Sequence, residues 1–275
     1  MKRKYSFSVP YKGNEEFLRI LDYNDIKGVD IMGNYYACSF LSDHLYAEEI
    51  LDLISKKDLK VSIDVVFSKE DLENANWYLF EVIRLDIQSS DPDYTYEYSC
   101  PYDTVTGIRY RHVKQVNYCV SKRTPKWKNN YNFCADNYGD YYEIYCSDIA
   151  KKMIKNRDIV GIDFCPVVNK KGEPTENVSQ LVYKHTLSVN SFKFIGKYRE
   201  FVCPTCGYVQ YLFDIPGEDN VRLLTETIPK GIDAFVADFQ MCAGQGRYPV
   251  IVSKKVYNLI AKEMKEKHVR FTPIG

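Results

Sequence analysis

The chain has 275 residues, of which 45% are hydrophobic and 27% charged, and its 37 Lys and Arg balance 37 Asp and Glu. This composition excludes a long disordered chain, and the zero net charge argues against a protein built mainly to bind nucleic acid. The length is enough for one large domain or two. Nine cysteines, no apolar leader and no apolar stretch near 18 residues predict a cytoplasmic protein with reduced thiols and no membrane span.

Residues 1–93 predict an N-terminal α+β module. Segments 5–9, 35–41, 59–66 and 77–87 have the composition of strands. Ser42 stands where it could cap a helix that runs to about residue 57, because apolar residues recur at helical spacing after it. Segment 88–93 is rich in turn-forming residues and marks the predicted end of the module.

Residues 94–168 predict a second module that carries a Cys-Pro motif. Tyrosines alternate with polar residues at positions 94, 96 and 98 and lead into Cys100-Pro101. The module closes with a strand over 141–146, a helix capped by Ser147 and a strand over 159–167. The helix is expected to turn Ile149, Met153 and Ile154 inward.

Residues 169–193 begin with a polar run that contains Gly172 and Pro174, which predicts a linker or long loop. Residues 194–275 predict a third module with Cys203-Pro204-Thr205-Cys206-Gly207 near its start. A strand, Ser253, an amphipathic helix and a final strand close this module. The residues expected on the inner face of that helix are Val256, Leu259, Ile260 and Met264.

The second and third modules match each other in order, which indicates an internal duplication. Four features correspond at offsets near 105 residues. They are the Cys-Pro pairs, the segments 133–136 and 235–238, the two capping serines, and the segments 164–167 and 271–274. A similar unit around Ser42 suggests a third copy, although strand–helix–strand units resemble one another in any α/β protein. The predicted fold class is α+β, with repeated strand–helix–strand modules, antiparallel sheets and a zinc-ribbon-like cysteine knuckle.

The segment 203–207 has the form of a tight turn that points two sulfurs at one centre. A structural zinc ion normally takes four ligands, so the predicted set is Cys203, Cys206, Cys100 and Asp103. Cys119, Cys242 and His112 are alternative ligands. A degenerate ribbon whose cysteines only pack is the competing interpretation. A redox pair is disfavoured, because such a pair usually opens a helix.

The sequence carries no familiar catalytic signature. Its four histidines are scattered, and no metalloprotease or nucleophile-elbow motif occurs. The 24 tyrosines suit a recognition surface, and they equally suit a protein rich in strands. The basic segment 122–128 contains one tryptophan and could contact nucleic acid, but a solvated loop is the simpler interpretation.

Residues 95–275 resemble the double-CxxCG-motif proteins, a bacterial family that includes immunity proteins of polymorphic toxin systems. The resemblance rests on segment 203–207, the incomplete copy at Cys100 and the tail 250–274, and the first motif lacks its second cysteine and its glycine. It implies a non-catalytic cytoplasmic protein that binds and neutralises a cognate toxin. The candidate anchors for that partner are Tyr94, Tyr96, Tyr98, Tyr141 and Tyr142. The alternatives are a zinc-ribbon-type nucleic-acid-binding or regulatory protein and an enzyme with an unrecognised site.

Overall fold

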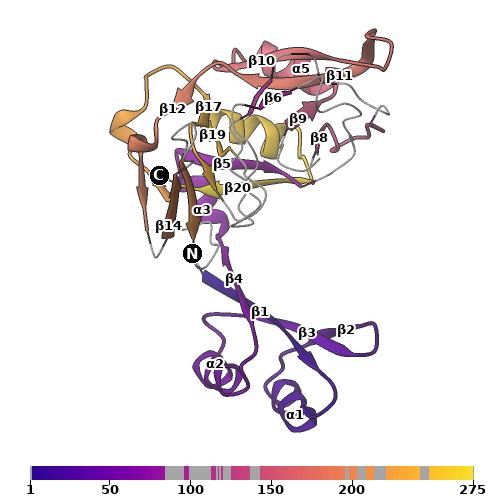
Figure 1. Ribbon diagram of the computed structural model, residues 1–275, viewed down its shortest axis with the longest axis vertical. Coiled ribbons are helices and arrows are strands. Elements are labelled where there is room, and N and C mark those ends of the chain that lie inside the picture. The colour runs from indigo at the N-terminus through magenta and orange to yellow at the C-terminus, as the bar shows by residue number, and fades with distance from the viewer. Residues whose placement is uncertain are drawn as a thin grey trace. The chain divides into compact units, whose positions relative to one another are not determined.

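The computed structural model describes residues 2–83, 96–98, 113–115, 117, 119, 125–136, 143–195, 198–202, 209–213, 221–241 and 248–274 (Figure 1). The fold is mixed α+β, and its sheets are mostly antiparallel, as predicted. The chain divides into two compact units, of which the first ends at Glu73 and the second begins at Asn74. Each unit is described separately below.

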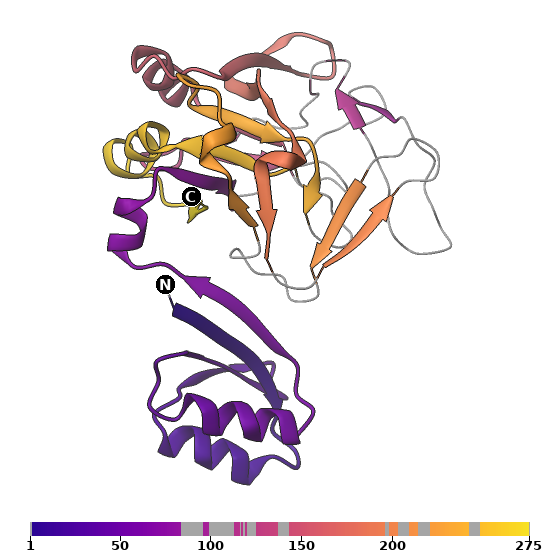
Figure 2. The ribbon, with the colours of Figure 1, turned by 90° about the vertical axis from the view of Figure 1, so that its left-hand side faces the viewer.

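The N-terminal unit contains one four-stranded antiparallel sheet with the strand order β2-β3-β1-β4. Its elements run β-α-β-β-α-β along the chain, which is the ferredoxin-like arrangement. Figure 2 shows both helices side by side on one face of the sheet. The elements are β1 (Lys2–Pro10), α1 (Glu15–Tyr23), β2 (Gly28–Ile31), β3 (Tyr35–Leu41), α2 (Ala47–Lys56) and β4 (Val61–Val66), followed by α3 (Lys69–Asn74).

The two helices of this unit bury one stripe each against the sheet. Phe17 and Leu21 lie one turn apart on α1 and pack with Phe7 and Val9 of β1. Glu15 and Glu16 occupy the first turn of α1, where carboxylates interact favourably with the helix dipole. The alternate residues of each strand point to the face of the sheet that the helices do not cover, because successive side chains point to opposite sides of a strand.

The C-terminal unit contains two larger sheets. The middle sheet has the order β10-β11-β9-β8, and the C-terminal sheet has the order β12-β17-β19-β5-β20. The middle sheet and its helix comprise β8 (Phe133–Asp136), β9 (Glu143–Cys146), α5 (Asp148–Asn156), β10 (Ile162–Val168) and β11 (Pro174–Tyr183). The C-terminal sheet comprises β5 (Trp77–Val82), β12 (Thr186–Leu187), β17 (Ala234–Ala237), β19 (Val250–Ser253) and β20 (Val269–Pro273). Its helix α6 (Lys254–Tyr257) continues as a π-helix over Asn258–Glu263.

Three small sheets complete the described part of this unit. Two of them are antiparallel pairs of strands, and the third adds a parallel strand to a hairpin. They comprise β6 (Tyr96–Tyr98) with β7 (Val113–Gln115), β13 (Phe192–Phe194) with β16 (Val221–Leu223), and β14 (Tyr198–Val202) with β15 (Val209–Phe213) and β18 (Gln240–Met241). The short 3₁₀ helices η1 (Val189–Ser191) and η3 (Thr225–Thr227) lie between strands.

The same connection occurs in all three large sheets. A strand, a helix and a second strand follow one another in β3-α2-β4, β9-α5-β10 and β19-α6-β20, and in each case a third strand antiparallel to both lies between the two strands. The inserted strands are β1, β11 and β5. Because β1 and β5 precede their helices in the chain whereas β11 follows α5, the inserted strand comes from different places in the sequence.

The register of the middle and C-terminal sheets also agrees. Ser179 of β11 lies between Cys146 and Pro166. Tyr78 of β5 lies between Val252 and Pro273. The two prolines therefore occupy the same place relative to the strands beside them.

Several sequence-based boundaries were wrong. Segment 169–193 is no linker, since β11 occupies much of it and pairs with both β10 and β9. The first compact unit ends at Glu73 and not at residue 93, because β5 pairs with β19 and β20. The predicted module boundaries at 93/94 and 193/194 therefore cut across the pairing of strands that are distant in sequence. The helix α1 was not predicted.

The predicted helix starts are only partly correct. Ser147 caps α5, since its Oγ accepts a hydrogen bond from the Ala150 amide at 3.2 Å. Ser42 caps no helix: α2 begins after Tyr46, and Ser42 Oγ accepts from the Arg3 amide instead. The four residues expected on the inner face of the last helix are buried, as predicted. Ile149, in contrast, is 62% exposed, and Ala150 takes the inward position.

Candidate functional site

The four predicted zinc ligands, Cys203, Cys206, Cys100 and Asp103, lie outside the described residues. The same holds for Tyr94, Tyr141, Tyr142, Cys242 and His112, whereas only the backbone of Tyr96 and Tyr98 is described. Within the ranges that the structure describes, no group of three or more His, Cys, Asp or Glu is placed to hold a metal ion.

The described strands do show how the chain enters and leaves both Cys-Pro motifs. Val202 pairs with Val209, so residues 203–208 connect the two strands of an antiparallel hairpin. Tyr98 pairs with Val113, so residues 99–112 connect a second hairpin. Cys203 therefore comes directly after β14 in the sequence and Cys100 comes two residues after β6, and each of these strands pairs with the next strand along the chain.

Cys119 belongs to a core and not to a described ligand cluster. Its side chain is fully buried, and its Sγ lies 2.7 Å from the Tyr145 hydroxyl oxygen in a hydrogen bond. It packs in a cluster with Cys134, Val167 and Val178. The cysteines whose state the structure describes, namely Cys38, Cys119, Cys134, Cys146 and Cys165, form no disulfide.

Burial favours the protonated form of three of the described thiols, those of Cys38, Cys146 and Cys165. It raises the pKa of Cys38 to about 11 and raises the pKa of Cys146 as well. The pKa of Cys165 is raised first by burial and then by the nearby carboxylates of Asp163 and Glu143. Because the thiolate is the reactive form, these three cysteines are poor nucleophiles at neutral pH.

Four large apolar side chains are exposed on the hairpin of β2 and β3. They are Val29 at 70%, Ile31 at 41%, Met32 at 93% and Tyr35 at 48% exposure, and they are called the β2–β3 patch. Val29 pairs with Ala37, and Ile31 pairs with Tyr35. Since Phe7 and Cys38 face the helices and pair with each other, Ala37 and Tyr35 point to the opposite face of the sheet.

Hydrogen bonds to Asp30 help to hold the turn of this hairpin in shape. Met32 and Gly33 both have positive φ, at 55° and 72°. Asp30 accepts a hydrogen bond from the Gly33 amide at 2.7 Å and another from the Tyr11 hydroxyl at 2.9 Å. The patch is therefore presented on a turn with a defined backbone. The patch was not predicted, although Gly33 between two short strand-like segments is a hairpin signal.

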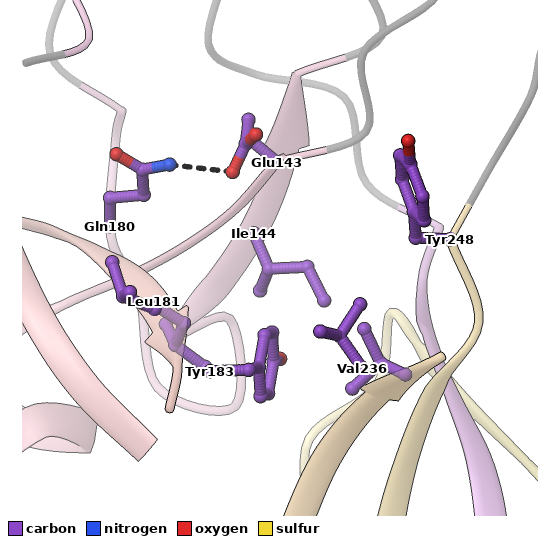
Figure 3. Close-up of a pocket in the computed structure, with 9 residues that line it drawn as sticks. Glu143, Ile144, Gln180, Leu181, Tyr183, Val236 and Tyr248 are labelled. Carbon is purple, nitrogen blue, oxygen red and sulfur yellow. Dashed lines mark hydrogen bonds between the residues drawn. The ribbon is translucent and has the colours of Figure 1, made fainter. Parts of the chain in front are cut away.

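The C-terminal unit contains a cavity of about 170 Å³ between the middle and C-terminal sheets. Figure 3 shows Glu143, Ile144, Tyr183, Val236 and Tyr248 around it. Gln180 is 1% exposed, and its amide nitrogen donates a hydrogen bond to Glu143 Oε2 at 2.5 Å. The cavity thus combines an oriented carboxylate, two tyrosine side chains and an aliphatic wall. None of these residues was predicted as part of a site.

No protein-family model matches the chain, and no relative is found among curated proteins. In the described ranges, every helix is too short or too polar to cross a lipid bilayer.

Proposed function

We propose that the chain is a non-catalytic binding protein that neutralises a cognate protein toxin by direct contact. The observation that carries this proposal is the β2–β3 patch, where Val29, Ile31, Met32 and Tyr35 are exposed together. Contiguous apolar side chains on a polar surface mark sites where proteins bind each other. The buried thiols with raised pKa values support a role without covalent chemistry.

The geometry of the patch suits a protein partner. Val29 and Ile31 lie on β2, which is the edge strand of its sheet, and Tyr35 lies beside them on β3. Met32 stands at the tip with 93% of its surface exposed, and methionine adapts its shape to irregular surfaces. A partner that covers these side chains gains apolar burial of about 25 cal/mol per Å².

We propose further that the three large sheets arose from one repeated strand–helix–strand module. The common strand order and the equivalent places of Pro166 and Pro273 support this origin. The hairpins around the two Cys-Pro motifs extend the correspondence toward the N-terminal side of each module. On this account the N-terminal unit is the copy that has gained a partner-binding hairpin.

The predicted zinc ion remains part of the proposal. Three thiolates and one carboxylate are a donor set that zinc accepts, and the hairpin that brackets residues 203–208 suits a ribbon knuckle. Metal analysis of the purified chain tests this directly. About one zinc per chain is expected, together with its loss in Cys203→Ser and Cys206→Ser, whereas a metal-free native chain would refute the site.

Affinity capture from the native cell tests the function. The chain is expected to retain one protein that is toxic when produced alone and harmless when produced with it. If nuclease treatment of the lysate abolishes the retention of every captured protein, the result supports the alternative of a nucleic-acid-binding ribbon protein and contradicts the toxin proposal. Recovery of no toxic protein would also contradict the proposal.

A further inference from the structure

One side of α5 carries two lysines that converge on a single aromatic ring. Lys151 and Lys155 are one helical turn apart and therefore project from the same side of the helix. The Nζ atoms of both lysines lie 5.7 Å from the centroid of the Phe164 ring in β10. The two nitrogens cannot be further apart than twice that distance. Two positive charges are thus held near each other where α5 packs on the middle sheet (Figure 1).

The sheet anchors one of these two charges. The Lys151 side chain is half-buried, and its Nζ donates a hydrogen bond to the Ser179 hydroxyl oxygen at 3.0 Å. Ser179 is 3% exposed and lies on β11 between Cys146 and Pro166. Because an ammonium group has three donors, Lys151 can donate to a further acceptor while it keeps this contact. The position of its charge is therefore set by a buried partner in the sheet.

The carboxylates around the two lysines do not balance their charge. Asp163 forms an ion pair with Lys184 at 3.0 Å. That contact is the main cause of the lowered pKa of Asp163, and Lys155 makes a smaller contribution. Asp148 lies in the first turn of α5, and within the described ranges it forms no ion pair with Lys151. A net positive charge remains when both carboxylates are counted against the three lysines.

A phosphate monoester matches these groups in charge and shape. Two ammonium groups can each donate to a different oxygen of one phosphate, and lysine is a common ligand of phosphate. A phosphate monoester carries about two negative charges at pH 8, so it suits two cations better than a singly charged carboxylate does. The half-buried Phe164 ring offers an apolar surface to the organic part of such a molecule.

We propose that Lys151 and Lys155 bind the phosphate group of a small phosphate monoester, with Phe164 as the apolar contact. Ser179 is a positioning residue, since it holds Lys151 and does not itself supply charge. This site lies in the C-terminal unit, whereas the β2–β3 patch lies in the N-terminal unit. The inference therefore does not rest on the proposed function, and a chain that neutralises no toxin can still bind the phosphate monoester.

Calorimetric titration of the full chain at pH 8 tests the site with two matched probes. Phenyl phosphate carries about two negative charges at this pH, whereas benzenesulfonate presents a tetrahedral oxyanion of similar size with a single charge. Phenyl phosphate is expected to bind about tenfold tighter or better, since the second ammonium group stabilises its second charge. Equal binding of the two probes, or no binding of phenyl phosphate at millimolar concentration, would overturn the proposal.

Three variants of α5 locate the binding. Lys155→Gln and Lys151→Gln each remove one charge, and each should weaken the binding of phenyl phosphate about fivefold or more. Lys152→Gln removes the same charge from the exposed position beside Lys151 and should change the affinity by less than about twofold. Because Lys155 is exposed, its variant should fold normally. Undiminished affinity in a folded Lys155→Gln chain, or an equal loss in Lys152→Gln, would refute the site.

A nucleic acid is the competing ligand for a surface with several lysines. Proteins that bind single strands contact many phosphates along a groove, so every lysine near the path contributes. A single-stranded DNA oligonucleotide should therefore fail to displace phenyl phosphate at physiological ionic strength if the site is local. Displacement by the oligonucleotide, with equal sensitivity to Lys152→Gln and Lys155→Gln, would show that the surface binds a polymer and would contradict the proposal.

Discussion

Ser253 and Asp233 are joined by two hydrogen bonds. The Ser253 amide donates to the Asp233 carbonyl oxygen, and the Ser253 hydroxyl donates to Asp233 Oδ1, both at 2.8 Å. Ser147 and Asn132 form the same two bonds in the middle sheet, at 2.9 and 2.7 Å. Each pair ties the residue at a helix start to the residue that precedes the neighbouring strand, and so fixes where the helix leaves its sheet.

The Ser147 hydroxyl should contribute measurably to stability. It donates to Asn132 and accepts from the Ala150 amide, and the side chain is buried. Ser147→Ala removes both bonds and is expected to lower the free energy of unfolding by about 1–2 kcal/mol. Urea denaturation measures the change. The exposed Thr225→Ala serves as the control, with an expected change within about 0.5 kcal/mol. Equal effects would contradict the role of Ser147.

Asn132 and Asp233 occupy equivalent places but should not be interchangeable. The Asn132 side-chain amide donates to Glu266 Oε1 at 2.5 Å. Asn132→Asp would place a second carboxylate there, and repulsion would raise the pKa of at least one of the two carboxyls in the folded state. The destabilisation, about 2 kcal/mol or more, is therefore present above that raised pKa and is relieved as the pH falls through it.

Denaturation at pH 8 and pH 5 checks this prediction. The loss of stability in Asn132→Asp should be larger at pH 8 than at pH 5. Asn190→Asp introduces the same charge at an exposed position and should show little change at either pH. A loss that is the same at both values would show that repulsion with Glu266 is not its cause.

Among the described glycines, Gly161 lies where the middle and C-terminal sheets approach each other most closely. Its φ is +104°, and an added Cβ would lie 2.4 Å from the Ala234 carbonyl oxygen. Gly161→Ala should cost about 3 kcal/mol or more, because both backbone strain and a clash with backbone oppose it. Gly172 also has positive φ but has open space around it, so Gly172→Ala should cost only about 1 kcal/mol. Thermal unfolding distinguishes the two, and similar losses would contradict the close approach.

Tyr78 should make the C-terminal sheet sensitive to alkali. Burial raises the pKa of Tyr78 to about 12, with a smaller contribution from Tyr257, whose ring stacks on it at 4.6 Å. A raised folded-state pKa stabilises the fold fully below the unfolded value near 10 and loses that effect as the pH rises toward 12. Stability should therefore fall between pH 10 and 12.

Tyr78→Phe isolates this contribution. The variant loses the hydrogen bond from the Tyr78 hydroxyl to the Ala75 carbonyl oxygen, which should cost about 1 kcal/mol at pH 7. It should also lose less stability than the unmodified chain between pH 10 and 12, as followed by urea denaturation. An identical alkaline slope in both proteins would contradict the assignment to Tyr78.

Local sequence patterns predicted individual helices and strands better than they predicted which strands pair with each other. The strand over residues 35–41 and the buried face of the last helix follow from side-chain alternation and helical spacing, which are local. The pairing of β5 with β19 and β20, and of β11 with β9, depends on contacts between residues far apart in sequence. That is why the boundary at residue 93 and the linker at 169–193 were wrong.

The cap predictions at Ser42 and Ser253 failed for a similar reason, whereas the one at Ser147 is confirmed. Ser253 does precede a helix, but its hydroxyl bonds Asp233, twenty residues earlier in the chain, in preference to the first helical turn. The alignment predicted for the two modules also differs by one residue from the serine contacts. Those contacts align Asn132 with Asp233, whereas the matched segments align Phe133 with Phe235. The register at Pro166 and Pro273 agrees with the sequence match.

Of the candidate sites, the cavity and the β2–β3 patch required the structure. Glu143 and Tyr248 are distant in sequence and meet only because two sheets come together. The exposure of Val29 and Met32 likewise depends on which face of the sheet the helices cover. The predicted ligands and tyrosine anchors stay predictions, since their side chains lie outside the described residues.

The affinity of the captured toxic partner for patch variants tests the central claim most directly. Tyr23→Lys changes an aromatic side chain that is 89% exposed at the end of α1, and it serves as the matched control. Calorimetry should show that Val29→Lys combined with Met32→Lys weakens binding at least about tenfold, while Tyr23→Lys leaves it unchanged. Equal affinity of all three proteins would contradict binding through the β2–β3 patch.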